Sequence, residues 1–165
     1  MTNPNFRPLL PSDEPFLWEM LYHALYVPPG QPPYPIEILQ KPEIRRYVEG
    51  WGRDGDSGYL ALVAAQPVGA CWLRLFSQSA PGYGFINEET PELSIALLPN
   101  FRGQGIGSAL MKYTLTHLDN KIHSVSLSVS ATNPAVEMYR RSGFNPIKLD
   151  DLRINSSFVM VKTIK

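Results

Sequence analysis

The stretch ELSIALLPNFRGQGIGSALMKY, residues 92–113, contains an apolar run that ends at a proline, then a glycine-rich turn, then the apolar spacing of a helix. The glycines of the turn, Gly103, Gly105 and Gly107, cost backbone entropy on folding, so we expect the turn to need them. A helix that begins directly after such a turn offers unpaired N–H groups and the positive end of its dipole. The stretch therefore predicts an anion-binding turn between a strand and a helix.

Two familiar phosphate loops do not fit this turn. The dinucleotide pattern G-x-G-x-x-G, begun at Gly103, has Ser108 in place of its third glycine, and it needs a βαβ unit, whereas antiparallel strands are predicted upstream. The P-loop pattern requires Gly-Lys-Ser/Thr from the position that Ser108 occupies. Neither of these nucleotide sites is predicted.

Length and charge limit the kind of protein this is. The chain has 165 residues, and we predict a single domain over residues 1–165. Fifteen basic residues balance fifteen acidic ones, so the overall charge favours neither nucleic acid nor a membrane surface as a partner. The first residues lack the pattern of a secretory signal, and the longest apolar run, 60–65, is too short to span a bilayer. These features predict a soluble, cytoplasmic protein.

The cysteine and the histidines argue against a metal site. Cys71 is the only cysteine and lies in an apolar run, which predicts a buried thiol and no intramolecular disulfide. His23, His117 and His123 have no metal-ligand spacing with each other or with Cys71. No metal is predicted.

Hydrophobic spacing and turn residues divide the rest of the chain into helices and strands. A helix with Ser12 at its N-cap is followed by a proline-rich segment, 28–42, and a short helix over 43–50. We then expect strands over 59–64 and 68–76 joined by a turn at 65–67, a strand over 92–98, a helix over 105–118, a strand over 123–131, a helix over 133–143, and strands over 144–150 and 155–164. This order, β-β-β-α-β-α-β-β after N-terminal helices, predicts an α/β fold with a mixed central sheet flanked by helices.

Two of the predicted strands have one bulky face and one small or polar face. In the first, Leu93, Ile95 and Leu97 alternate with Glu92, Ser94 and Ala96; in the second, Val125, Leu127 and Val129 alternate with Ser124, Ser126, Ser128 and Ser130. Room for a ligand would explain the small faces, and so would close packing by a helix or plain exposure to solvent.

Two motifs together resemble a known family. Arg102-Gly103-Gln104-Gly105-Ile106-Gly107 follows a strand, and Asn133-Pro-Ala-Val-Glu-Met-Tyr139-Arg-Arg-Ser-Gly-Phe144 follows about thirty residues later. The pair is similar to the pyrophosphate loop and the second signature, N-x-x-A-x-x-x-Y-x-x-x-G-F, of the GNAT superfamily of N-acetyltransferases. The resemblance covers nearly the whole chain, with residues 27–57 the least typical part. It implies a GNAT-like domain that uses acetyl-CoA as cosubstrate.

The resemblance also implies where acetyl-CoA lies. The loop amides, with Arg102 as a nearby cation, would bind the pyrophosphate; the residues concerned are Gly103, Gln104, Gly105, Ile106, Gly107 and Ser108. The superfamily's fold implies that the strand at 92–98 parts from its neighbour at 124–131, which would let backbone groups around Leu97 and Leu98 pair with the pantetheine arm. Asn133 would contact the same arm, and it also suits the N-cap of the 133–143 helix, which ends at Gly143.

Acetyl transfer to an amine needs a group that removes a proton and a group that supplies one. Glu92 is the carboxylate of the 92–98 strand and lies on its small-residue face, where many superfamily members place a base; the alternative is an exposed carboxylate at a strand end. Tyr139 occupies the tyrosine position of the second signature, which implies a proton donor to the leaving thiolate. It could equally pack on an apolar stripe of its helix.

No residue identifies the acceptor. Small-molecule amines, peptide N-termini and lysine side chains all remain open, and a homodimer is compatible with the resemblance. Five aromatic residues could line an acceptor cleft or fill the core: Tyr26, Tyr34, Trp51, Trp72 and Tyr83. The alternative to an amine N-acetyltransferase is a non-catalytic module that binds acyl-CoA or a protein partner, with the proline-rich segment as its docking surface.

Overall fold

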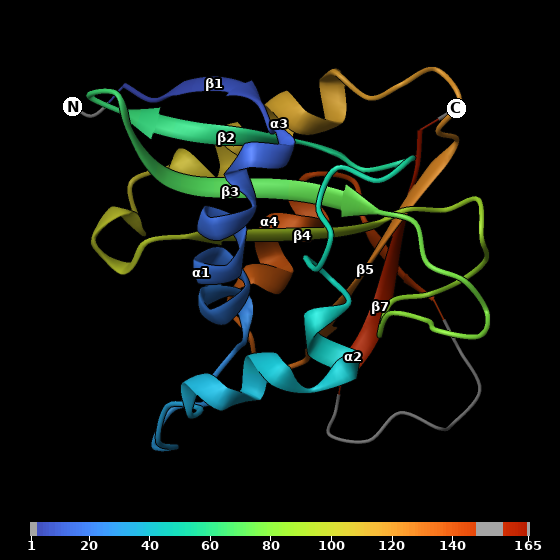
Figure 1. Cartoon of the computed structure of the whole chain (residues 1–165), viewed down its shortest axis with the longest axis horizontal. Helices are drawn as coiled ribbons and strands as arrows, with labels where there is room; N and C mark the ends of the chain where they lie inside the picture. The colour runs from blue at the N-terminus through green and yellow to red at the C-terminus, as the bar shows by residue number, and fades with distance from the viewer. Residues whose placement is uncertain (1–2, 148–156, 165) are drawn as a thin grey trace.

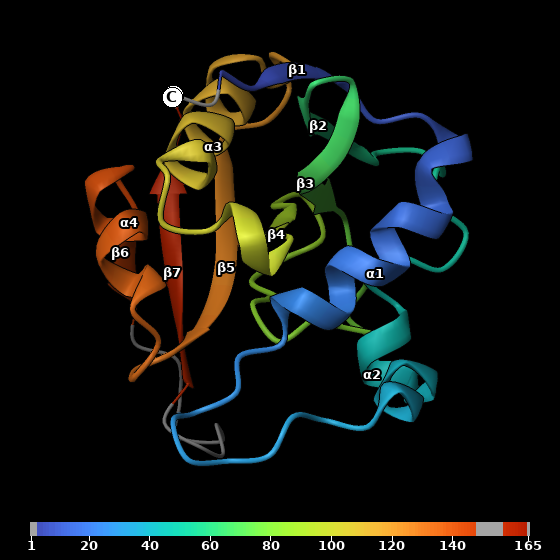
Figure 2. The same ribbon diagram turned by 90° about the vertical axis from the view of Figure 1, so that its left-hand side faces the viewer.

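The alternating apolar residues of the chain build one sheet with helices on both faces (Figures 1 and 2). This computed structural model describes residues 3–147 and 157–164, and within them the chain forms seven strands and four α-helices. The strands are β1 (Asn5–Pro8), β2 (Ser57–Val63), β3 (Gln66–Arg74), β4 (Glu92–Leu97), β5 (Ser124–Ser130), β6 (Asn145–Ile147) and β7 (Ser157–Thr163). The helices are α1 (Glu14–Ala24), α2 (Pro42–Arg45), α3 (Ile106–Thr116) and α4 (Ala135–Arg141), with short 3-10 turns at Pro11–Asp13, Ile36–Gln40 and Pro99–Phe101.

The sheet is mixed, as the sequence predicts. Its strand order is β1-β2-β3-β4-β5-β7-β6, and the described neighbours are antiparallel except for β4 and β5. Those two strands are parallel because α3 carries the chain back between them, a crossover that a parallel pair requires. The parallel pair lies in the middle of the sheet, with the β1–β4 meander on one side and β5–β7 on the other.

The sheet separates two hydrophobic cores. On one face α1 and the α2 region bury residues such as Leu17, Met20 and Trp72. On the other face α3 and α4 cover residues such as Leu110 and Leu127. Figure 2 shows α1 and α2 on the opposite side of the sheet from α3 and α4. Burial on both faces agrees with the predicted α/β class.

The motif helices form close to where the sequence places them. The helix predicted over 105–118 is α3, and the one predicted over 133–143 contains α4. Asn133 Oδ1 accepts a hydrogen bond from the Ala135 N–H at 2.9 Å, and Gly143 follows α4 with a φ of +98°, as expected for a left-handed C′ residue. Residues 148–150 and 155–156 of the last two predicted strands lie outside the described residues.

The first hairpin turn is tighter than predicted. The turn expected at 65–67 is formed instead by Ala64 and Ala65, with φ values of +49° and +65°, so Gln66 and Pro67 belong to β3. Two consecutive left-handed residues give the two-residue connection whose twist matches the strands. Alanine gives no sequence signal for that conformation, which is why the prediction was wrong here.

The start of the chain contains an element that the sequence analysis missed. Residues Asn5–Pro8 form β1, which pairs antiparallel with β2. The predicted N-cap, Ser12, lies in a 3-10 turn, and Asp13 precedes α1 instead. The Asp13 carboxylate accepts the Leu10 N–H at 2.7 Å and binds Arg7 of β1 at 2.8 Å, and this bonding with Arg7 lowers the pKa of Asp13. The ion pair therefore ties β1 to the first helix.

Candidate active site

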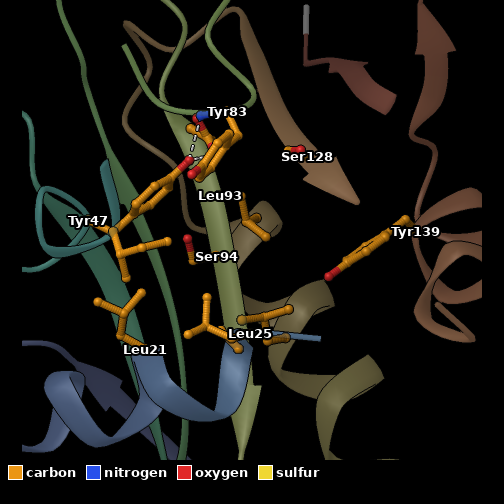
Figure 3. A pocket seen from close by; sticks show the side chains of 12 residues that line it. Leu21, Leu25, Tyr47, Tyr83, Leu93, Ser94, Ser128 and Tyr139 are labelled. Atoms are coloured by element: carbon orange, nitrogen blue, oxygen red, sulfur yellow. Dashed lines mark hydrogen bonds between the residues drawn. The ribbon is translucent and has the colours of Figure 1, made fainter. Parts of the chain in front are cut away.

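β4 and β5 meet at one end and separate along the rest of their length. Among the described residues, their pairing consists of Glu92 opposite Ser126, where the Ser126 N–H donates to the Pro91 carbonyl at 3.0 Å. Beyond that point a pocket of about 150 Å³ opens between the two strands, with walls from α1 and α4 (Figure 3). The separation that the family resemblance implies is thus present.

The small-residue faces of both strands point into this pocket. Ser94 of β4 and Ser128 of β5 line it, whereas Ala96 packs in the core beneath α1. Apolar residues of α1 and its C-cap, among them Leu21 and Leu25, form the opposite wall. Both explanations of the small faces therefore apply, since part of the face packs against a helix and part leaves open space.

Alternate backbone N–H and C=O groups of β4 point toward the gap. The Leu98 N–H donates to the Val68 carbonyl at 2.8 Å, so Leu98 faces β3. Because bonded and non-bonded pairs alternate in an antiparallel ladder, the N–H and C=O groups of Ile95 and Leu97 point away from β3, toward β5. Of the two residues predicted to meet pantetheine, Leu97 therefore has the suitable orientation, while the Leu98 amide is engaged within the sheet.

The glycine turn lies at the far end of the gap from Glu92. Gly103 and Gly105 have φ values of +74° and +84°, and no heavy atom lies within 4 Å of where a side-chain carbon would be placed on either. The first helical hydrogen bond of α3 runs from the Ala109 N–H to the Gly105 carbonyl. The N–H groups of Ile106, Gly107 and Ser108 precede this bond and therefore have no partner within the helix. Gln104 Nε2 donates to the Asn100 carbonyl at 3.0 Å and stays within the loop.

Arg102 connects the glycine turn to the end of α1. Its Nε donates to the Leu97 carbonyl at 3.3 Å, and its Nη2 approaches the His23 carbonyl at 3.5 Å. Burial, and after it the Arg102 charge, lowers the pKa of His23. The guanidinium thus places a fixed positive charge beside the loop and also occupies the Leu97 carbonyl.

Gly107 lies where α3, β4 and α4 converge. A side-chain carbon on it would be 3.5 Å from Leu97 Cδ1 and 3.8 Å from Met138 Sδ, which are ordinary contact distances. Tight helix packing therefore does not by itself require glycine at this position. The contacts do show that the start of α3 adjoins the gap on both sides.

Tyr139 extends from α4 into the pocket. Its ring contacts Phe144 edge-on, with centroids 6.2 Å apart, and its hydroxyl points toward the β4 side of the pocket (Figure 3). Burial raises the pKa of Tyr139 above its ordinary value, so the phenol stays protonated across the physiological range. The side chain packs against the apolar core and also lines the pocket, so packing does not keep Tyr139 away from the open space.

Glu92 is buried at the closed end of the pocket. The side chain is 4% exposed, which rules out the alternative of an exposed carboxylate at a strand end. Its Oε2 accepts a hydrogen bond from the Tyr47 hydroxyl at 2.5 Å, and its Oε1 accepts the Gly84 N–H at 3.0 Å. The carboxylate also lines the pocket. Tyr139 and Glu92, distant in sequence, therefore border one cavity.

The aromatic residues considered as a cleft wall divide between several places. Tyr83 lines the pocket and is 51% exposed, whereas Trp51 and Trp72 are buried in the core. Tyr34 lies exposed on the proline-rich segment, and the Tyr26 hydroxyl donates to the Thr132 carbonyl at 2.9 Å. That last bond joins the end of α1 to the turn before α4 and so bridges the two sides of the gap.

Tyr47 is the pocket residue that the sequence analysis missed. It follows α2 in a segment predicted to be helical, and its ring is buried while its hydroxyl reaches Glu92. A buried tyrosine usually has a hydrogen-bond partner, but the partner here is 45 residues away in the sequence. The available signal was a tyrosine next to the apolar Val48 in a short segment predicted to be helical, and this signal does not specify the hydrogen-bond partner.

Metal-binding and thiol chemistry were considered within residues 3–147 and 157–164. No cluster of histidine, cysteine and carboxylate side chains there could hold a metal ion. Burial raises the pKa of the Cys71 thiol to about 12, so it is neutral and unreactive. No described helix is long and apolar enough to cross a membrane.

Several solved structures share this fold over nearly the whole chain. The ribosomal-protein-alanine N-acetyltransferase of Brucella melitensis has a TM-score of 0.67 at 23% identity, covering 96% of this chain and 99% of its own. The yncA protein of Salmonella typhimurium, solved with its cofactor acetyl-CoA, has a TM-score of 0.68 at 15% identity, covering 99% and 95%. The PaiA N-acetyltransferase of Thermoplasma acidophilum, in complex with coenzyme A, has a TM-score of 0.65 at 18% identity, covering 98% and 99%. These likenesses show the fold.

Sequence comparison identifies the family. A mycothiol acetyltransferase of Catenulispora acidiphila is 35% identical over 101 residues, an alignment that covers 60% of this chain and spans 31% of that relative's length. The sequence profile of the acetyltransferase (GNAT) family matches residues 18–144, which include the glycine turn, the Asn133–Phe144 motif and the strands between which the pocket opens. The chain therefore belongs to the acetyltransferase (GNAT) family.

Proposed function

We propose that this chain transfers the acetyl group of acetyl-CoA to a primary amine by direct attack, with both substrates bound at once and no covalent enzyme intermediate. The observation that carries the proposal is the gap between β4 and β5. It runs from the buried Glu92, where the strands pair, to Leu97 beside Gly107 at the start of α3, and Tyr139 projects into it. Family membership supports the same reaction.

The residues along the gap suit the chemical groups of acetyl-CoA. The first-turn amides of α3, Ile106 to Ser108, and the open space at Gly103 and Gly105 favour a pyrophosphate, and Arg102 adds a positive charge. The Leu97 N–H faces the gap, where it can pair with an amide of the pantetheine arm. Asn133, whose Oδ1 binds the Ala135 N–H at the start of α4, would contribute a further contact to this arm. When bound, acetyl-CoA would supply the activated acetyl thioester.

Glu92 is proposed to prepare the amine. An alkylamine is largely protonated near neutral pH, so a proton must leave nitrogen before that nitrogen can attack. The Glu92 carboxylate borders the pocket and can accept this proton, directly or through water. In the reaction the nitrogen forms a bond to the acetyl carbon while the carbon–sulfur bond breaks, giving an acetylated amine and CoA.

Tyr139 is proposed to protonate the departing sulfur. Because burial raises its pKa, the phenol stays protonated, and its O–H can donate to the sulfur as negative charge develops there during cleavage of the carbon–sulfur bond. Its hydroxyl points toward the β4 side of the pocket, where the thioester would lie if pantetheine pairs with Leu97. Solvent returns the proton to Tyr139 after CoA leaves.

The test is thiol release from acetyl-CoA with a panel of primary amines, using wild type and Tyr139→Phe. We expect turnover by wild type and a kcat about 100-fold lower in the variant, because proton transfer by a positioned side chain contributes on this order. The dissociation constant for acetyl-CoA should stay within about twofold, since the phenol acts on the leaving group.

Tyr113→Phe is the matched control. It removes a hydroxyl from α3 in an aromatic cluster with Phe6 and Tyr59, away from the pocket, and should keep wild-type kcat. Tight CoA binding by a folded wild type that turns over no amine would instead establish the non-catalytic acyl-CoA-binding module.

A further inference from the structure

A loop between β3 and β4 covers the buried end of the pocket. Its glycines lie directly on the Glu92 side chain: a side-chain carbon on Gly82 would be 2.2 Å from Glu92 Oε1 and 2.8 Å from the Tyr47 hydroxyl. On Gly84 it would be 2.9 Å from the Leu127 carbonyl carbon and 3.0 Å from Glu92 Cδ. The loop can approach the carboxylate this closely because both positions lack a side chain.

The Tyr47 hydroxyl is the junction between this loop and the carboxylate. It donates to Glu92 Oε2 at 2.5 Å and accepts the Tyr83 N–H at 2.7 Å (Figure 3). The neighbouring Gly84 N–H donates to Glu92 Oε1 at 3.0 Å. The Tyr47 hydroxyl thus donates its proton to β4 and accepts a hydrogen bond from the loop between β3 and β4. The Tyr83 side chain, held by this backbone contact, lines the open part of the pocket.

Contacts with neighbouring residues fix both the backbone and the ring of Tyr47. Its carbonyl accepts the Trp72 Nε1–H at 3.1 Å, and its ring meets Phe76 edge-on with centroids 5.0 Å apart. Nη1 of the buried Arg74 donates hydrogen bonds to the Arg46 carbonyl at 3.0 Å and to the Glu49 carbonyl at 2.7 Å. These two residues lie on either side of Tyr47 in the sequence. The hydroxyl is therefore presented by a backbone fixed on both sides.

The Tyr47 hydroxyl stays protonated, so it can donate to the Glu92 carboxylate. Burial, and after it the Glu92 charge, raises the pKa of Tyr47 well above its ordinary value. Arg74 lies opposite Glu92 in the ladder, but its guanidinium is bound to Asp56. Among the described residues, Tyr139 lies across the pocket and Tyr83 in the loop, with Glu43 and Arg46 beside Tyr83. The α1 side of the wall is apolar, with Leu21, Ala24 and the C-cap residue Leu25.

We propose that Tyr47 is a positioning residue of this active site, which orients the Glu92 carboxylate and couples it to the backbone of the 82–84 loop. The inference rests on the proposed function, because it treats Glu92 as the base. A hydrogen bond donated to a carboxylate stabilises its charged form, so the same contact sets the pH range in which Glu92 can accept a proton. It also fixes the loop that carries Tyr83 at the acceptor side of the pocket.

The experiment compares Tyr47→Phe with wild type in two measurements. In the pH profile of kcat/KM, the acidic limb should move to higher pH by about one unit, because the charged carboxylate loses a donor. Amide hydrogen exchange, followed by NMR in the absence of substrate, should be at least about tenfold faster at Tyr83, whose N–H loses its acceptor. An unchanged acidic limb, or unchanged exchange at Tyr83, would overturn the proposal.

Controls separate this inference from the proposed function. Tyr22→Phe removes a hydroxyl bonded to the Tyr34 carbonyl at 2.6 Å and should alter neither measurement. Acetyl-CoA affinity reports whether each variant is folded. Glu92→Gln with full activity would refute Glu92 as the base, whereas an impaired Glu92→Gln beside a normal Tyr47→Phe would refute the role of Tyr47 alone. If the two side chains act as a unit, the double variant loses no more than Glu92→Gln.

Discussion

Arg74 shows how a single buried charge can be fully compensated. Its side chain is 1% exposed, yet Nε and Nη2 bind both oxygens of Asp56, at 3.0 and 2.8 Å. Nη1 donates to two carbonyls of the segment after α2, and the guanidinium lies 5.4 Å from the centre of the Trp51 ring. Such a bidentate pair is satisfied as long as both partners are present.

Removing this guanidinium should cost far more than removing an exposed one. We expect Arg74→Met to lower the free energy of unfolding by about 3–5 kcal/mol, because Asp56 would remain buried without its partner. Arg45→Met is the comparison, since Arg45 pairs with Glu49 on the exposed surface, and it should change stability by less than about 1 kcal/mol. Urea denaturation of both variants measures the difference, and equal losses would contradict the expectation.

Single residues were predictable where a local pattern specifies them. Tyr139 stands at a fixed place in the second motif, and Glu92 is the carboxylate on the small-residue face of the strand before the first motif; both border the pocket. Tyr47 was not predictable, because its role depends on contacts with Glu92 and with the backbone of Tyr83, which only the folded chain brings near. Likewise, the sequence could not show that Arg102 would bind carbonyls of β4 and α1.

The strand–turn–helix unit of residues 92–113 can be tested as an element. Gly105→Glu would place a negative side chain at the start of α3, where an anion is proposed to bind, and we expect the dissociation constant for CoA to rise at least about tenfold. Calorimetry measures it. Gly30→Glu is the control, because Gly30 also has a φ of +84° and open space around it, so it imposes the same backbone strain elsewhere. Unchanged CoA affinity in folded Gly105→Glu would refute the phosphate assignment.

Elements with a long periodic pattern were predicted well, and short or unusual ones were not. α3 and β5 lie within the ranges expected from apolar spacing. β1 spans Asn5–Pro8, too short for alternation to be visible, and it exists because β2 offers an open edge for pairing. The Ala64–Ala65 turn is imposed by the strands it joins, since alanine alone does not favour a positive φ.

At the scale of the whole molecule, the sheet is divided at the β4–β5 pair. The N–H groups of Ile95 and Leu97 face the gap, so we expect them to exchange with solvent faster than those of Ser94 and Ala96, which face β3. Acetyl-CoA should slow exchange at Leu97 at least about tenfold if the pantetheine arm pairs there. NMR-detected exchange with and without the ligand measures this, and an unaffected Leu97 would contradict the proposed binding mode.

Because the sheet is divided, the stability of the protein should depend on the concentration of acetyl-CoA. A ligand lying between the β1–β4 and β5–β7 halves contacts both and binds the native chain alone, so at a free concentration 100 times its dissociation constant it adds about 2.7 kcal/mol to the free energy of unfolding. Such a gain is a large fraction of the stability of a typical domain. When acetyl-CoA is scarce, a larger share of the protein would be open to proteases, and its steady-state abundance would fall with the metabolite that it consumes.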